Sequence, residues 1–431
     1  MLESFFKLSE NGTEVRTELI AGLTTFLTMA YIIFVNPMIL ADAGLDRNAV
    51  FMATCLAAAI GTAIMGLYAN YPIALAPGMG LNAYFTYGVV KGMGLAWEVA
   101  LGAVFISGVL FLLLSLFRTR EWIINAIPRS LKLATSAGIG MFLAIIGLKN
   151  AGIVVDHPAT LVGVGDLTQP AAYLAVLGFV IMVALDFRRI PGAIIIGIVV
   201  VSAIGIVAGV SPFNGIVSAP PSLAPTLMKF DIAAAFQIGL IGIVFAFLFV
   251  DLFDTAGTLV GIAHRAGFLD ADGKLPRIRK ALVADSVATM AGAALGTSTT
   301  TSYIESAAGV RAGGRTGLTA VTVAALFLLA IVFSPLATTI PAYATAPALV
   351  FVACMMARGL AEFDWDDVTE YAPAVVCAFA MPFTFSIATG IGFGFITYAL
   401  AKIMAGRFNE ASWPVLVIAA AFVVKFIVIP G

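Results

Sequence analysis

The chain has 431 residues, of which 61% are hydrophobic and only 11% are charged. With the 42 glycines included, the apolar class reaches roughly 70%, against about 45–50% in an average soluble domain. About 263 hydrophobic residues would supply some thirteen membrane spans of ~20 residues each. A net charge of -1 offers no basic surface for nucleic acid. Composition therefore excludes a soluble enzyme and a nucleic-acid-binding protein.

Motifs for a metal, a redox pair or a cofactor are not recognisable in the sequence. Cys55, Cys354 and Cys377 lie far apart in apolar runs, while His157 and His264 lie in polar connections. The sequence GMGLNA is not surrounded by the strand and helix of a dinucleotide site, and no phosphate-binding loop is present. We therefore expect no cofactor and no ATP hydrolysis by this chain.

Apolar segments in chain order predict an all-α polytopic membrane protein with about fourteen spans. The segment from Ala372 to Met404 is long for one span and short for two, so the count at the C-terminus is the least defined. The expected spans are Leu19 to Leu40, Phe51 to Ala69, Ile73 to Val90, Ala96 to Phe117, Leu131 to Leu148, Ala171 to Leu185, Ile190 to Val210, Ile232 to Ile262, Ala281 to Leu295, Gly296 to Ala308, Leu318 to Leu336, Ala344 to Leu360, Ala372 to Met404 and Trp413 to Ile429.

The distribution of Lys and Arg predicts a cytoplasmic N-terminus, because basic residues are enriched in cytoplasmic connections. With that orientation the outer side carries only four basic residues through the twelfth span: Arg47, Lys91, Lys149 and Lys229. The inner side carries sixteen: Lys7, Arg16, Arg118, Arg120, Arg129, Lys132, Arg188, Arg189, Arg265, Lys274, Arg277, Arg279, Lys280, Arg311, Arg315 and Arg358.

Two short polar segments interrupt the pattern, and each is the third segment of its half. They are ALAPGMGLNAYF, from Ala74 to Phe85, and GTSTTTSYIESAAG, from Gly296 to Gly309. Paired interruptions of this kind indicate a transporter site, because broken backbone inside a membrane must be satisfied by protein or by a water-filled cavity. Seven spans in each half predict that the second half is inserted upside down, as an inverted repeat.

Ionisable residues inside apolar segments are the candidates for function, because each costs perhaps ~2.5–3.5 kcal/mol to insert. Asp254 and Glu305 are interpreted as functional, whereas Asp285 follows Lys280 closely enough for an ion pair or a capping role. Asp251 lies three residues before Asp254, near the same helix face.

These groups suit a cation or a neutral polar solute. A carboxylate can accept hydrogen bonds from ring N–H groups and can also carry a proton. A displacement of about 223 residues puts Asn82 opposite Glu305, and its amide could read the edge of a heterocycle or cap the backbone.

Four motifs together resemble the azaguanine-resistance branch of the nucleobase-cation symporters, the adenine, guanine and hypoxanthine permeases. They are RTELIAGLTTFLTMAYIIFVNP at 16–37, APGMGLNAYF at 76–85, FVDLFDTAGTL at 249–259 and TSTTTSYIESAAGVRAGGRTGLTA at 297–320. The resemblance covers essentially the whole chain.

The resemblance implies a seven-plus-seven inverted repeat in which segments 3 and 10 are short strands followed by half-helices. A cytoplasmic segment (1–18) precedes a core domain of spans one to four and eight to eleven (19–117 and 232–336). A gate domain would comprise spans five to seven and twelve to fourteen (118–210 and 337–431), with a linker at 211–231. The location implied is the plasma membrane, the bacterial inner membrane, and a homodimer is possible.

The resemblance also implies a role for each site residue. Asp254 and Glu305 would bind the base and are the candidates for carrying the proton, with Asn82 nearby. The DTAGT motif at 254–258 favours Asp254 over Asp251 as the ligand. Residues expected beside these ligands are Asp251, Ser302 and Thr258.

The function implied is import of hypoxanthine, guanine or adenine by proton symport, with purine, proton and lipid as partners. Alternatives are a uracil, xanthine or anion carrier of the same superfamily and, more remotely, a membrane enzyme with paired carboxylates. An anion would call for a positive site, and no Lys or Arg lies at the centre of either broken segment. An inverted-repeat architecture has no role in the chemistry of such a membrane enzyme, which disfavours that alternative.

Overall fold

The fold is described from a computed structural model that covers residues 2–116, 128–236, 241–268 and 275–428. Arg118, Arg120 and Lys274, used above for orientation, lie outside the described residues. So do residue 117, at the expected end of the first core segment, and residues 237–240, near the expected start of the eighth span.

The first half of the chain is helical except for one short strand in the middle and a hairpin near residue 160. Its elements are α1 (Leu2–Phe6), η1 (Ser9–Asn11), α2 (Val15–Met29), α3 (Ile32–Ala41), α4 (Arg47–Ile64), η2 (Met65–Ala69), β1 (Leu75–Pro77), α5 (Met79–Ala83), η3 (Tyr84–Gly92), α6 (Trp97–Leu116), α8 (Arg129–Asn150), β2 (Val154–His157), β3 (Leu161–Val164), α9 (Pro170–Phe187) and α10 (Ala193–Val207).

The second half also places a short strand and a short helix between long helices. Its elements are α11 (Ile232–Ala235), α12 (Ile241–Ala266), α13 (Ile278–Leu295), β4 (Thr300–Ser302), α14 (Ser306–Arg311), α15 (Gly317–Ala330), η5 (Ile331–Phe333), α16 (Ser334–Thr339), α17 (Ala342–Ala357), η6 (Arg358–Glu362), α18 (Val368–Thr384), α19 (Ile387–Met404), η7 (Phe408–Glu410) and α20 (Trp413–Val428).

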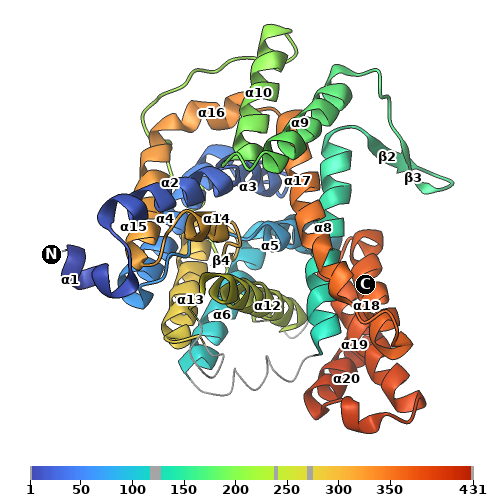
Figure 1. Cartoon of the computed structure of the whole chain (residues 1–431). Helices are drawn as coiled ribbons and strands as arrows, with labels where there is room; N and C mark the ends of the chain where they lie inside the picture. The colour runs from blue at the N-terminus through green and yellow to red at the C-terminus, as the bar shows by residue number, and fades with distance from the viewer. Residues whose placement is uncertain (1, 117–127, 237–240, 269–274, 429–431) are drawn as a thin grey trace.

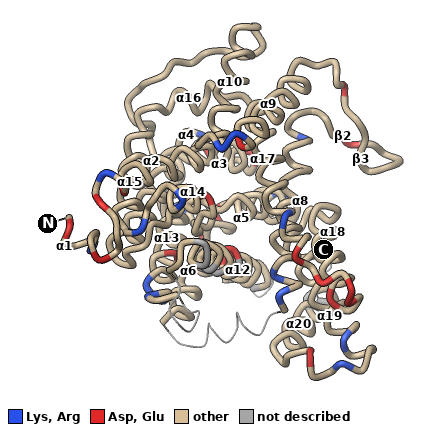
Figure 2. Tube along the Cα trace, in the orientation of Figure 1, with Lys and Arg blue, Asp and Glu red and all other residues tan. Residues whose placement is uncertain are grey.

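The predicted membrane character is confirmed by long apolar helices. Within the described part of the chain, nine are long and apolar enough to cross a bilayer: Val15–Ala41, Arg47–Ala69, Trp97–Leu116, Arg129–Asn150, Pro170–Phe187, Gly242–Ala263, Gly317–Thr339, Ala342–Glu362 and Ile387–Met404. Three shorter apolar helices are Ala193–Val207, Val368–Thr384 and Trp413–Val424. Figure 2 shows that most Lys and Arg residues lie near helix ends and in connections.

The long helices pack in two groups that lie side by side in Figure 1. The first group contains α2, α4, α6, α13 and α15, with α12 packed against α6. The second contains α8, α17, α18 and α19, with α9 and α10 packed on α17. The short strands belong to the first group, because β1 contacts α4 and β4 contacts α13. Of the helices that follow them, α14 packs on α2, whereas α5 contacts α3 and also α8 of the second group.

Two local features differ from the sequence prediction. The segment from Ala372 to Met404, predicted as one span, falls in two packed helices, because Phe385 adopts a left-handed conformation (φ 49°) between α18 and α19. Residues 154–164 form the β2–β3 hairpin, which hydrophobicity alone did not indicate. It is mostly exposed, so its formation depends on backbone pairing rather than on burial.

Candidate functional site

The two interrupted segments meet as an antiparallel pair of short strands. β1 pairs with β4 in the register Leu75 with Ser302, Ala76 with Thr301 and Pro77 with Thr300. As the resemblance implies, each strand is followed by a short helix, α5 or α14. Residues more than 220 positions apart in sequence are thereby placed next to each other, in fully buried backbone.

Threonines from neighbouring helices complete the hydrogen bonding of these strands. Thr62 of α4 both donates to the Leu75 carbonyl at 2.9 Å and accepts from the Leu75 N–H at 2.8 Å. Thr289 of α13 donates to the Thr300 carbonyl at 2.9 Å. Strand edges inside a membrane require such partners, because no water is available there.

Asp254 lies on α12, beside the paired strands, and is partly buried. The Thr301 hydroxyl of β4 donates to Asp254 Oδ2 at 3.1 Å. Gly78, at the end of β1, makes room for this contact: a Cβ there would lie 2.4 Å from Thr301 Cγ2 and 3.8 Å from Asp254 Oδ2. The carboxylate thus faces the ends of both strands.

Glu305 precedes α14 and is also partly buried. The Tyr31 phenol, from the turn between α2 and α3, donates to Glu305 Oε1 at 2.7 Å. The charge of Asp254 acts on Glu305, and the charges of both act on Tyr31 and Tyr303. The structure therefore brings the two predicted carboxylates into one electrostatic neighbourhood.

Asn82 lies on α5, with its side chain fully buried. Its Nδ2 is 3.5 Å from the Pro77 carbonyl, which also accepts the Tyr303 hydroxyl at 2.5 Å. Among the described residues, its amide oxygen Oδ1 has no hydrogen-bond partner. An acceptor left without a partner in a buried position costs free energy, about 1–3 kcal/mol, unless another group satisfies it.

The three residues expected beside the ligands lie on two elements: Asp251 and Thr258 on α12 and Ser302 on β4. Ser302 donates to Asp285 Oδ1 at 3.2 Å, and Thr255 donates to the same oxygen at 2.9 Å. Asp285 therefore joins α12, α13 and β4 through hydroxyl groups, a contact that the sequence did not indicate. Asp251 accepts from Thr289 at 3.4 Å, and Thr258 is buried on α12 beyond Asp254.

Several polar side chains of this region were not selected by the sequence analysis, among them Tyr31, Thr301 and Tyr303. Thr301 and Tyr303 stand inside a quoted motif, and their signal was the density of hydroxyl groups in TSTTTSYIES. Tyr31 also lies inside a quoted motif, at 16–37, but no cluster of hydroxyl groups marked it, since a single tyrosine in an apolar span is ordinary.

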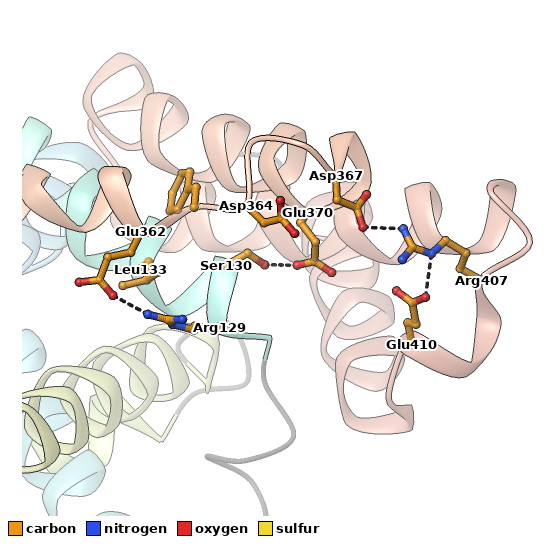
Figure 3. A pocket seen from close by; sticks show the side chains of 10 residues that line it. Arg129, Ser130, Leu133, Glu362, Asp364, Asp367, Glu370, Arg407 and Glu410 are labelled. Atoms are coloured by element: carbon orange, nitrogen blue, oxygen red, sulfur yellow. Dashed lines mark hydrogen bonds and ion pairs between the residues drawn. The ribbon is translucent and has the colours of Figure 1, made fainter.

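A second polar cluster lies at the end of the other helix group, around a cavity of about 340 Å³ (Figure 3). Buried Lys402 lies 2.7 Å from Glu370 Oε1, 2.7 Å from Glu410 Oε2 and 3.8 Å from Asp367 Oδ2. Arg407 pairs with Glu410 at 2.7 Å and with Asp367 at 2.5 Å.

Spacing would allow these three carboxylates to hold a metal ion, but they already share two cations. The hydroxyl of Thr369 and the guanidinium of Arg407 lower the pKa of Asp367. Hydrogen bonds from Lys402 and Arg407 lower the pKa of Glu410. The cluster is therefore an ion-pair network that ties α18, α19 and η7 together, and the Ser130 hydroxyl of α8 joins it through Glu370 at 2.6 Å.

Comparison with known proteins identifies relatives along nearly the whole chain. Residues 16–426 match the model of a family described as the permease family. The adenine permease AdeP of Escherichia coli is 50% identical over 100% of this chain and 96% of its own length. The guanine/hypoxanthine permease PbuO of Bacillus subtilis is 45% identical over 98% of this chain and 100% of its own.

Among solved structures, the transmembrane domain of the cyanobacterial bicarbonate transporter BicA matches with a TM-score of 0.66. It is 15% identical, and the match covers 88% of this chain and 97% of that one. The likeness concerns the fold alone.

Proposed function

Because this chain belongs to the nucleobase permease family, we propose that it imports purine bases by proton symport and binds them with Asp254, Glu305 and Asn82. Membership makes the chain an integral membrane transporter rather than an enzyme, as the sequence predicted. The names of its relatives point to adenine, guanine and hypoxanthine as the substrates to test.

One observation carries the assignment of the site: Asp254 accepts a hydrogen bond from β4, and Glu305, which follows that strand by three residues, lies close enough for the charge of Asp254 to act on it. Two carboxylates offer acceptors to the ring N–H groups of a purine, and the buried Asn82 oxygen offers a third acceptor. A neutral base suits this set better than an anion, because the groups that line it are carboxylates, hydroxyls and an amide.

In the proposed mechanism the two helix groups alternate between two arrangements, and this change carries the base across the membrane. The group around α2, α4, α13 and α15 would be the core, and the group around α8, α17, α18 and α19 the gate. A carboxylate of the site would take up a proton on the outer side, bind the base and release both inside. The two arrangements must differ by only a few kcal/mol for the cycle to run.

Several finer features of this proposal rest on the sequence and on the resemblance. They are fourteen spans in two inverted repeats, the domain boundaries given above, a cytoplasmic N-terminus and a bacterial inner membrane. The homodimer also stays a prediction. The mirrored supply of threonine partners to β1 and β4 supports the repeat, because Thr62 and Thr289 come from the helices that precede the two strands.

Uptake in cells that lack their own purine carriers tests the proposal. Labelled adenine, hypoxanthine and guanine would be compared with uracil, with and without a protonophore. We expect at least one purine to accumulate and the accumulation to collapse when the proton gradient is removed. Accumulation that survives the protonophore would refute proton coupling, and uptake of uracil alone would favour the carrier of another base.

A further inference from the structure

A break in the first apolar segment places one tyrosine at the site. α2 ends at Met29 and α3 begins at Ile32, so Ala30 and Tyr31 form a turn between them. The turn is tightened by hydrogen bonds from the Ile33 N–H to the Ala30 carbonyl and from the Phe34 N–H to the Tyr31 carbonyl, both at 3.1 Å. The side chain of Tyr31 is 1% exposed.

The buried phenol of Tyr31 forms a hydrogen bond with the carboxylate of Glu305. It donates to Glu305 Oε1 at 2.7 Å, and Thr28, on the preceding turn, lies 3.5 Å from the Glu305 carbonyl. Within the described part of the chain, Tyr31 is the side chain that donates a hydrogen bond to this carboxylate. Asp254 takes its hydrogen bond from Thr301, on a different element.

We propose that Tyr31 is the positioning residue for Glu305: it holds Oε1 and leaves Oε2 to accept the N–H of the base. This inference rests on the proposed function, in which Glu305 binds the substrate. The hydrogen bond fixes the rotation of the carboxylate, so the direction in which Oε2 points is set by the α2–α3 turn. The first apolar segment thereby takes part in substrate recognition without touching the base.

The same contact controls the charge of Glu305. A hydrogen bond donated to a carboxylate stabilises its ionised form. The other ionisable side chains close to this contact are Asp254 and Tyr303. Without the phenol, more of Glu305 is expected to carry a proton.

Chemical labelling tests the contact without any substrate. Dicyclohexylcarbodiimide reacts with protonated carboxyl groups in membranes, and peptide mass spectrometry reports the fraction of Glu305 modified. We expect Tyr31→Phe to speed labelling of Glu305 by about tenfold, in line with the loss of a hydrogen bond to a charged group. Equal rates in Tyr31→Phe and the unchanged protein, between about pH 6 and pH 9, would overturn the proposal.

Tyr84→Phe is the matched control for this experiment. Tyr84 is fully buried and packs against Phe247, but its hydroxyl has no hydrogen-bond partner among the described residues. Removing that hydroxyl should leave the labelling of Glu305 unchanged. Size-exclusion profiles of the detergent-solubilised variants show whether each one folds.

Glu305→Asp tests the same hydrogen bond by changing the acceptor, because the shorter side chain moves the carboxyl away from Tyr31 by one methylene. Its carboxyl should be labelled rapidly whether or not Tyr31 is also changed. If Tyr31→Phe does not fold, slow labelling of the Glu305→Asp carboxyl is enough to reject the proposal.

Adenine binding to the purified transporter gives the functional half of the test. We expect Tyr31→Phe to weaken binding by about tenfold in the unchanged background and by little in the Glu305→Asp background. Equal losses in both backgrounds would mean that Tyr31 acts on the fold and not through Glu305. If the unchanged protein binds no purine, the proposed function fails, whereas the labelling result still decides whether Tyr31 positions Glu305.

Discussion

Asp254 and Glu305 are each held by one hydroxyl group, and the two hydroxyls come from different parts of the chain. Thr301 belongs to the strand that precedes Glu305, whereas Tyr31 belongs to the first apolar segment. Each carboxylate is partly buried. A carboxylate that keeps acceptor capacity beyond one hydroxyl partner suits the recognition of a ligand that donates through N–H groups.

Removing either charge should abolish transport. In Asp254→Asn and Glu305→Gln the side chain keeps its size but loses an ionisable acceptor, so both substrate binding and proton transfer suffer. We expect purine uptake to fall by about a hundredfold or more, corresponding to the loss of hydrogen bonds to charged groups.

Asp186→Asn, at an exposed position of α9, is the control for that measurement and should transport normally. Uptake is to be normalised to the amount of protein in the membrane. Normal transport by both site variants would refute the assignment of the two carboxylates.

At the scale of residues, the informative signal was an ionisable side chain inside an apolar segment, where such side chains are rare. It selected Asp254 and Glu305, and the matching displacement selected Asn82. For Asp285 the sequence suggested a structural ion pair or a capping role, and the structure shows the hydroxyl groups of Thr255 and Ser302 donating to it. The sequence shows which charged residues a segment contains, but the groups that donate hydrogen bonds to them belong to other elements of the fold.

Among the elements, α15 has an unusual anchor at its N-terminus. Glu18 of α2 is fully buried and accepts from the backbone N–H groups of Arg315, Thr316 and Thr319, at 2.8, 3.2 and 3.1 Å. The Thr319 hydroxyl adds a fourth hydrogen bond at 2.6 Å. These N–H groups have no partner within the helix, and the positive end of the helix dipole favours a carboxylate there.

Glu18→Ala should therefore destabilise the protein without touching the site. Leaving several buried N–H groups without an acceptor is expected to cost about 3 kcal/mol. Thermal unfolding in detergent, followed by size-exclusion chromatography, measures the loss. Glu14→Ala, one turn earlier and exposed, should unfold like the unchanged protein, and an equal effect of both substitutions would contradict this role of Glu18.

The existence of the elements followed largely from the sequence, because apolar runs of helical length are a local property. Breaks were harder to predict. The two interruptions were expected from their short polar segments and the strands within them from the resemblance, whereas the left-handed Phe385 between α18 and α19 was not expected. A bulky residue in that conformation is uncommon and is held by surrounding structure, which no local pattern reveals.

On the scale of the whole molecule, a few polar contacts connect the proposed core and gate. The Thr345 hydroxyl of α17 donates to Met38 Sδ of α3 at 3.0 Å. Arg47, which begins α4, donates to the Ile340 carbonyl at 3.2 Å, just before α17. Packing is tight elsewhere: a Cβ on Gly80 of α5 would lie 2.3 Å from Ile139 Cγ2 of α8. Alternating access would have to break such contacts.

A cross-link between the two groups should stop transport. Met38→Cys combined with Thr345→Cys, after Cys354→Ser removes the exposed native thiol, places two thiols where the side chains already touch. We expect oxidation to block purine uptake and a reductant to restore it. Each single cysteine variant is the control, and full uptake by the oxidised pair would argue against relative motion of α3 and α17.

The sequence by itself determined three properties: the protein is a membrane protein, a few charged residues lie in its apolar segments, and two of those segments are interrupted. These properties depend on each residue and its neighbours along the chain, because the cost of burying a charge in lipid is local. Tertiary structure alone decided that β1 pairs with β4, that Tyr31 reaches Glu305 and that Glu18 caps α15. Those contacts join residues more than 200 positions apart, and only the packing of the whole chain brings them within hydrogen-bonding distance.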